Sequence, residues 1–256
     1  MKSFVFITRC SIVCVAALLL NSRPAIGQIP GGAGGAAGMN ASMVRLFGSN
    51  TNFIAKAEAR VVDKKQQETT SMLMGFEMLA GKIRVDVNMA DVKSREMPPE
   101  FVATMTKMGM GEMTTILLPD QKVIISIYPG LKSYAESPMP KDDIEASTKQ
   151  YKIEKTRLGK ETIDGHACEK DSVTLTDTAG TKDHITVWYA ADLKDFPIQM
   201  QIPTDDSTLT MKFKDVKLGR PETSRFQAPP GLAKFDSVNA LMYDAVNKKS
   251  NPGARK

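Results

Sequence analysis

The sequence predicts a mainly β protein, or an α+β protein whose antiparallel sheet is strongly curved. From Asn52 onward, short segments with alternating apolar and polar residues recur at even spacing, as is typical of strands with one buried and one wet face. Turn residues separate most of them, so neighbours are joined as hairpins, and about 9–11 strands are expected. No long helix alternates with these segments, which argues against a parallel sheet.

The amino-terminal residues have the features of a secretory signal. An apolar run of eleven residues, Cys10–Leu20, follows a positively charged start, and it is too short to span a bilayer, which takes about 20 residues. Small residues at Ala25 and Gly27 fit signal peptidase cleavage. We predict a signal peptide over 1–27 with cleavage near Gly27, and a periplasmic or secreted mature chain. An uncleaved membrane anchor is the alternative.

Charge and cysteine content limit the kinds of partner and covalent bond that the mature chain can have. Loss of Lys2, Arg9 and Arg23 with the signal would change the net charge from +5 to +2. No basic stripe of the kind that binds nucleic acid is present, so we expect no nucleic-acid partner. Cys168 would be alone in the mature chain, which excludes an internal disulfide. We expect a monomer with no transmembrane segment after cleavage.

The elements follow in order along the chain. Residues 28–50 hold a Gly/Ala-rich tether, "PGGAGGAAG", and a short amphipathic helix within Met39–Phe47. Residues 51–237 form the β domain. Residues 238–256 form a carboxy-terminal helix and a basic tail, with Ser237 as the helix N-cap. Residues 158–165, "LGKETIDG", are expected to form the turn between two strands.

The region 98–109, "PPEFVATMTKMG", interrupts the strand pattern. Proline at its start and apolar residues at helical spacing predict a short helix that ends at Gly109. Four methionines within 105–113, "MTKMGMGEM", lie at the end of this helix and beyond it. Thioethers can ligate Cu(I), or they can fill irregular space beside a flexible apolar ligand.

The order of several motifs resembles one known group. The motifs are "LLPDQKVIISIYPGLKSYAE", "LGKETIDGHACEK", "ITVWYAADLKDFPIQM" and "FKDVKLGRPETSRFQAPPGLAKF", over roughly residues 51–236. They resemble secreted bacterial proteins of unknown function in the superfamily of the periplasmic outer-membrane lipoprotein carriers. The resemblance implies a half-barrel sheet with short helices across its concave face, over an apolar cavity. Members close to the carrier hold acyl chains there.

Apolar residues predicted to line this cavity come from several strands and from the short helix. Their methionines recur far apart in sequence, which a metal site would not require. Plain core packing and Cu(I) binding by the methionine cluster remain alternatives to a ligand cavity. The candidate ligand-binding residues are Met72, Met74, Phe76, Met78, Phe101, Met105, Met108, Met110, Met200, Met211 and Phe213.

The sequence supports a metal site or a catalytic site less well than it supports a ligand cavity. Asp164, His166 and Cys168 share one face of a strand and could form a Zn or Cu ligand set, although Asp164 also suits a turn. A Cys168–His dyad lacks a visible orienting group, and no Gly-x-Ser-x-Gly elbow is present. We therefore predict no enzyme activity, no catalytic residue, no cofactor and no metal.

The sequence thus predicts a non-catalytic protein of the bacterial periplasm that binds a hydrophobic ligand: an acyl chain, a lipid or a lipidated protein. A second hypothesis is a protein-interaction or envelope-structural module whose core is filled and which binds no small ligand. A third is Cu(I) handling through the methionines.

Overall fold

A computed structural model describes residues 43–250. The predicted signal peptide, most of the tether and the last six residues therefore lie outside the described residues. The described strands are β1 (Asn52–Asp63), β2 (Glu68–Leu79), β3 (Lys82–Asn88), β4 (Lys93–Ser94), β5 (Glu112–Leu118), β6 (Val123–Tyr128), β7 (Ser133–Pro138), β8 (Lys152–Ile163), β9 (His166–Thr176), β10 (Lys182–Ala190), β11 (Phe196–Pro203), β12 (Ser207–Leu218) and β13 (Ala233–Phe235).

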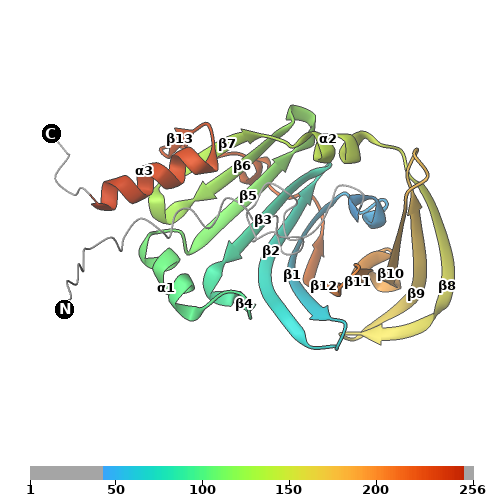
Figure 1. Cartoon of the computed structure of the whole chain (residues 1–256). Helices are drawn as coiled ribbons and strands as arrows, with labels where there is room; N and C mark the ends of the chain where they lie inside the picture. Colours follow the sequence, from blue (N-terminus) through green and yellow to red (C-terminus); the bar gives the residue numbers. More distant parts are fainter. Residues whose placement is uncertain (1–42, 251–256) are drawn as a thin grey trace, which may run out of the picture.

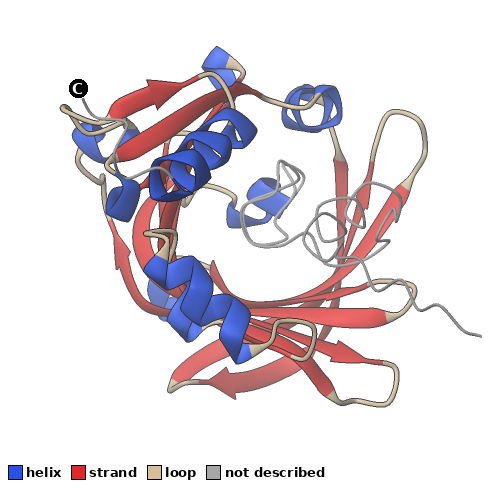
Figure 2. Ribbon diagram, turned by 60° about the vertical axis from the view of Figure 1, so that its left-hand side comes forward, coloured by secondary structure: helices blue, strands red, loops and turns tan. Residues whose placement is uncertain are grey.

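These strands form one sheet that curves into an arch (Figures 1 and 2). Their order is β13-β7-β6-β5-β3-β2-β1-β12-β11-β10-β9-β8, and β4 pairs with β2. The β13–β7 pair is parallel, and the others are antiparallel. Since β8 and β13 stand at opposite ends of the order, the barrel is open. The predicted class and curved antiparallel half-barrel are confirmed, with thirteen strands because β4 and β13 are too short to show alternation.

The arch has an inner face, defined here as the face on which Phe53, Ala55, Ala57 and Ala59 of β1 lie. All four are buried, and their polar neighbours along β1 point to the opposite, outer face. The 3-10 helix η2 (Met43–Phe47) lies within the arch against this face (Figure 2). The main core is therefore on the inner side of the sheet.

Within residues 43–250, three α-helices accompany the sheet: α1 (Pro99–Lys107), α2 (Lys141–Thr148) and α3 (Val238–Ser250). The predictions of α1 and α3 are confirmed, and the Ser237 hydroxyl accepts a bond from the Ala240 N–H as an N-cap. Helix α2 was not predicted, because "KDDIEAST" has one large apolar residue, Ile144, and hence no apolar stripe. Short 3-10 turns complete the chain: η3 (Met89–Asp91), η4 (Pro119–Gln121), η5 (Pro129–Leu131), η6 (Ala191–Leu193) and η7 (Thr223–Phe226).

Part of the outer face is also covered. Residues 219–232, here called the strap, connect β12 to β13 and include η7. Phe226 of the strap is buried against outer-face residues of β5 and β6, among them Ile116 and Ile125. This explains why β5 and β6 are buried on both faces, whereas β1 and β3 alternate.

The expected turn at 158–165 is wrong in its position. Strand β8 continues to Ile163, and the turn is made by Asp164 and Gly165, with φ of 49° and 88°. A register shift between Arg157 and Gly159 absorbs Leu158 as a bulge. Gly159 therefore lies at an irregularity inside an edge strand.

Among the described residues, no helix is long and apolar enough to cross a membrane.

Candidate functional site

Along the middle of the inner face, β1 carries only small side chains. Ala57 lies directly between Met74 of β2 and Phe213 of β12, and Ala59 lies between Met72 and Met211. Alanines flanked by long side chains on both neighbouring strands leave a trough, which we call the alanine trough (Ala55, Ala57 and Ala59).

Strand register extends the walls of the trough into two adjacent rows across the sheet. In each row the residues are direct cross-strand partners, so their side chains share the inner face. The rows are Val187–Met200–Met211–Ala59–Met72 and Phe213–Ala57–Met74–Val87–Met113. Five of these residues are methionines: Met72, Met74, Met113, Met200 and Met211. Their unbranched side chains can repack around a ligand.

The ring of Phe47 in η2 lies at one end of the trough. Its centroid lies 4.9 Å from that of Phe53, 5.5 Å from that of Phe213 and 6.2 Å from that of Phe76. Phe47 is 1% exposed. Phe47 therefore packs among phenylalanine rings at the end of the trough next to Ala55, whose direct partner is Phe76.

Polar contacts outside the trough hold η2 in place. The Arg45 guanidinium donates to the Ser147 carbonyl at the end of α2, at 3.0 Å. Asn50, which follows η2, donates from Nδ2 to the Lys194 carbonyl at 3.0 Å. Met43, Leu46 and Phe47 of η2 are buried in the main core, so apolar packing also ties η2 to the sheet.

The structure gathers some of the predicted ligand-binding residues and separates others. Those at or near the trough are buried on the inner face, apart from the partly buried Met72: Met72, Met74, Phe76, Met78, Met200, Met211 and Phe213. Met105, Met108 and Met110 pack in a different cluster, beneath α3. Phe101 of α1 is 42% exposed and belongs to neither group.

The cluster beneath α3 contains one methionine from outside the segment 105–113. Met242 of α3 joins Met105, Met108, Met110 and Met113, around the buried Leu241 and Tyr128. Met242 could be recognised only once α3 was placed over β7. Burial raises the pKa of the Tyr128 hydroxyl, which stays protonated beside the thioethers.

Asp164, His166 and Cys168 do not converge. The Asp164 carboxylate accepts from Lys212 at 3.1 Å, and His166 Nδ1 lies 2.7 Å from the Asp192 carboxylate. The Cys168 thiol is 2% exposed and donates to the His166 carbonyl at 3.3 Å. Burial raises the pKa of this thiol, which disfavours the thiolate that a nucleophile or metal ligand requires. In the part of the chain that the structure describes, no three such side chains are grouped as metal ligands.

Residues 68–217, more than half of the chain, match the model of a domain of unknown function, DUF4412. The chain belongs to the DUF4412 family. No protein with a curated description matches it.

Three solved structures illustrate what the DUF4412 chain is similar to. LprF from Mycobacterium bovis is 14% identical over 71% of this chain and 96% of its own, with a TM-score of 0.36. LppX, a lipoprotein of Mycobacterium tuberculosis, is 12% identical over 69% and 93%, with a TM-score of 0.38. The LolA superfamily protein NE2245 from Nitrosomonas europaea is 10% identical over 73% and 94%, with a TM-score of 0.36. Likeness this distant says nothing about what this chain binds.

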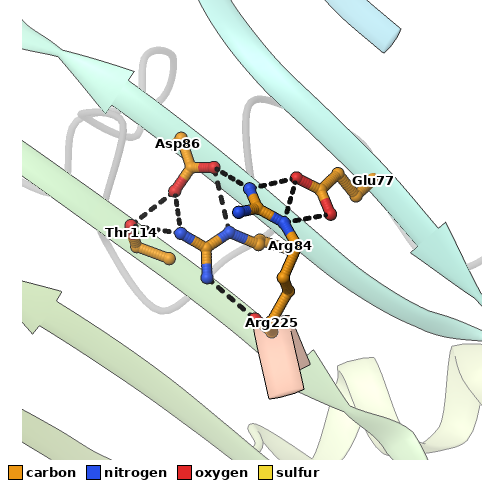
Figure 3. Close-up of polar contacts among 5 residues, drawn as sticks. All are labelled: Glu77, Arg84, Asp86, Thr114 and Arg225. Carbon is orange, nitrogen blue, oxygen red and sulfur yellow. Dashed lines mark hydrogen bonds and ion pairs between the residues drawn. The ribbon is translucent and has the colours of Figure 1, made fainter. Parts of the chain in front are cut away.

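The DUF4412 match begins at β2 and ends within β12, so it leaves η2, β1 and the strap outside it. The strap is attached to the matched region by a polar network on the outer face (Figure 3). Arg225 donates two bonds from Nε to the carboxylate of Glu77, at 2.8 Å each, and a further bond from Nη2. Glu77 is 4% exposed, so Arg225 supplies the charge that a buried carboxylate needs.

The rest of the network joins β3 and β5. Arg84 donates to both oxygens of Asp86, at 2.9 and 2.7 Å, and to the Arg225 carbonyl at 2.8 Å. The Thr114 hydroxyl donates to Asp86 at 2.5 Å. An open groove of about 650 Å³ continues along the outer face beside this network, next to Leu73 and Gly75. Its cations, Lys56 and Arg84, are already paired with Asp215 and Asp86, so the network is structural.

Proposed function

We propose that this DUF4412 protein binds a hydrophobic molecule, most specifically an acyl chain, in the alanine trough. The observation that carries the proposal is the trough itself. Its floor is made of small residues, its walls are methionine and phenylalanine, and the Phe47 ring of a short 3-10 helix covers its Ala55 end. An acyl chain would take the place of Phe47, and η2 would move away from the sheet.

Binding would be driven by removal of apolar surface from water, at about 25 cal/mol per Å². Methionine walls suit such a ligand, because their unbranched thioethers adapt to chains of different length. The expected setting is the periplasm, as the amino-terminal signal suggests. No chemical step on the ligand is part of the proposal.

The same proposal includes a second region, the methionine cluster beneath α3, into which the ligand could extend. None of the residues of α1 is fully buried, so this helix is held less tightly than the strands. The row that ends at Met113 leads from the trough to this cluster. Displacement of α1 would therefore extend the trough past Met105 and Met108.

The test is to purify the mature protein from its own envelope and to record native mass spectra, with organic extraction of the same sample. Co-purified lipid, or displacement of a fluorescent fatty-acid probe, supports the proposal. An empty extract together with no probe binding would reject it.

The Phe47 ring packed at the end of the trough also favours a second function, a protein-interaction module that binds no small ligand. This alternative predicts the negative result in both measurements. Cu(I) binding by the methionine cluster is separated from both by competition with a Cu(I) chelator, because only that function predicts metal transfer to the protein.

A further inference from the structure

Beyond the trough, the inner face contains one buried polar group without a partner. Tyr189 of β10 is 5% exposed, and its hydroxyl finds no hydrogen-bond partner in residues 43–250. A buried hydroxyl left unpaired costs about 1–3 kcal/mol, so such groups are rare and call for an explanation.

Strand alternation places the Tyr189 side chain on the inner face, next to a register shift in the pairing of β10 with β11. Tyr189 follows Ile185 and Val187 at intervals of two along β10, so all three share the inner face. Val187 is the direct partner of Met200, the first methionine of a trough wall. An acyl chain lying along that row would bring its end close to Tyr189.

A cation stands next to the same ring. The Lys155 ammonium of β8 lies 3.9 Å from the centroid of the Tyr189 ring. Lys155 forms no ion pair with a described residue, whereas the neighbouring Arg157 and Glu169 pair with each other at 2.5 Å. A second acid, Asp171, lies nearby, and its negative charge raises the pKa of the Tyr189 hydroxyl.

The edge strand β8 is exposed to solvent beside this position. Lys155 and Ile153 of β8 are exposed, Ile153 by 41%, although their partners Val173 and Leu175 on β9 are fully buried. A ligand could therefore reach Tyr189 from the β8 side of the arch without crossing the core.

The hydroxyl is in its donor form. Burial, with the charge of Asp171 adding to it, raises the pKa of Tyr189 far above its usual value. A protonated hydroxyl beside an ammonium provides two donors and suits an oxygen acceptor with negative charge.

We infer that Tyr189 and Lys155 form a polar subsite for the carboxylate head of the bound acyl chain. This inference rests on the proposed function, because it gives the ligand of the trough a defined class: a fatty acid, with its tail along Val187, Met200 and Met211. The head would receive a bond from the Tyr189 hydroxyl and the charge of Lys155.

The experiment compares three probes that share a twelve-carbon chain: dodecanoate, its methyl ester and dodecylamine. Their affinities are measured by titration calorimetry for the unaltered protein and for Tyr189→Phe and Lys155→Met. We expect the unaltered protein to prefer dodecanoate to the ester by about tenfold, and each variant to lose most of that preference. Tyr243→Phe on the exposed face of α3 and Lys160→Met on β8 are the matched controls and should keep it.

Folding is checked in the same samples. Tyr189→Phe removes an unpaired hydroxyl and keeps the ring, so its melting temperature should not fall below that of the unaltered protein. Equal affinity for acid and ester in the unaltered protein, or a preference that survives both substitutions, would overturn the subsite and leave the proposed function standing. Absence of binding to all three probes would overturn both.

Discussion

Replacement of Phe47 by alanine tests whether the trough is a binding site. The ring is 1% exposed and lies within 6.2 Å of four other phenylalanine rings, counted between centroids. Loss of such a ring from a core costs about 3–5 kcal/mol. Because η2 is short and can settle toward the sheet, we expect a value near the lower end, about 3 kcal/mol.

The same substitution should open the trough to a ligand. Its walls would keep Met74, Met211 and Phe213, and an acyl chain could enter without displacing η2. Saturation with dodecanoate at about 100 times its dissociation constant should restore about 2.7 kcal/mol of stability. The ligand should also bind the Phe47→Ala protein more tightly than the unaltered one, since no side chain has to leave first.

Urea unfolding with and without dodecanoate measures both effects. Phe226→Ala is the matched control, because this ring is also buried, at 2% exposed, but lies on the outer face beneath the strap. It should lose a similar free energy but recover less of it at the same dodecanoate concentration, because Phe47 still has to leave the trough before the ligand binds. Equal recovery in both variants, or none in Phe47→Ala, would refute a ligand site at the trough.

Three further predictions concern the contacts that hold the fold. Arg225→Ala should lower the free energy of unfolding by about 3 kcal/mol, since it leaves the Glu77 carboxylate buried and unpaired. Urea unfolding should show a smaller loss in the Glu77→Gln/Arg225→Ala double variant. An equal loss in both proteins would contradict the role of Arg225 as the partner of Glu77. The bond from Lys214 to Glu58, at 2.7 Å, lowers the pKa of Glu58 below its usual 4.5. The stability that this bond contributes is therefore present above pH 4.5 and is lost as the pH falls through the lowered value. Unfolding curves of Glu58→Gln should depend less on pH in that range than those of the unaltered protein. Gly130→Ala would place a Cβ 2.5 Å from the Gly109 carbonyl oxygen, so it should lower the free energy of unfolding by about 1–3 kcal/mol and speed proteolysis within α1. Gly180→Ala is the control: its Cβ meets no atom within 4 Å, so the cleavage rate of α1 should stay unchanged.

Local sequence patterns were sufficient for the class of the fold. Period-two alternation in β1 and β3 depends only on residues a few positions apart, and it marked the buried face correctly. The same holds for α1, where proline stands at the start, and for the Ser237 cap of α3. The sequence also indicated that Met74, Met200, Met211 and Phe213 would share an interior.

Contacts between distant residues were decided only by the tertiary structure. The pairing of Glu77 with Arg225 links residues 148 positions apart, and no local pattern announces it. The strap buries the outer face of β5 and β6, so their alternation disappears. The sequence likewise could not show that Phe47 covers the Ala55 end of the alanine trough or that the Tyr189 hydroxyl is left without a partner. Alternation determines which side of a strand is apolar, but only the folded sheet determines what lies against that side.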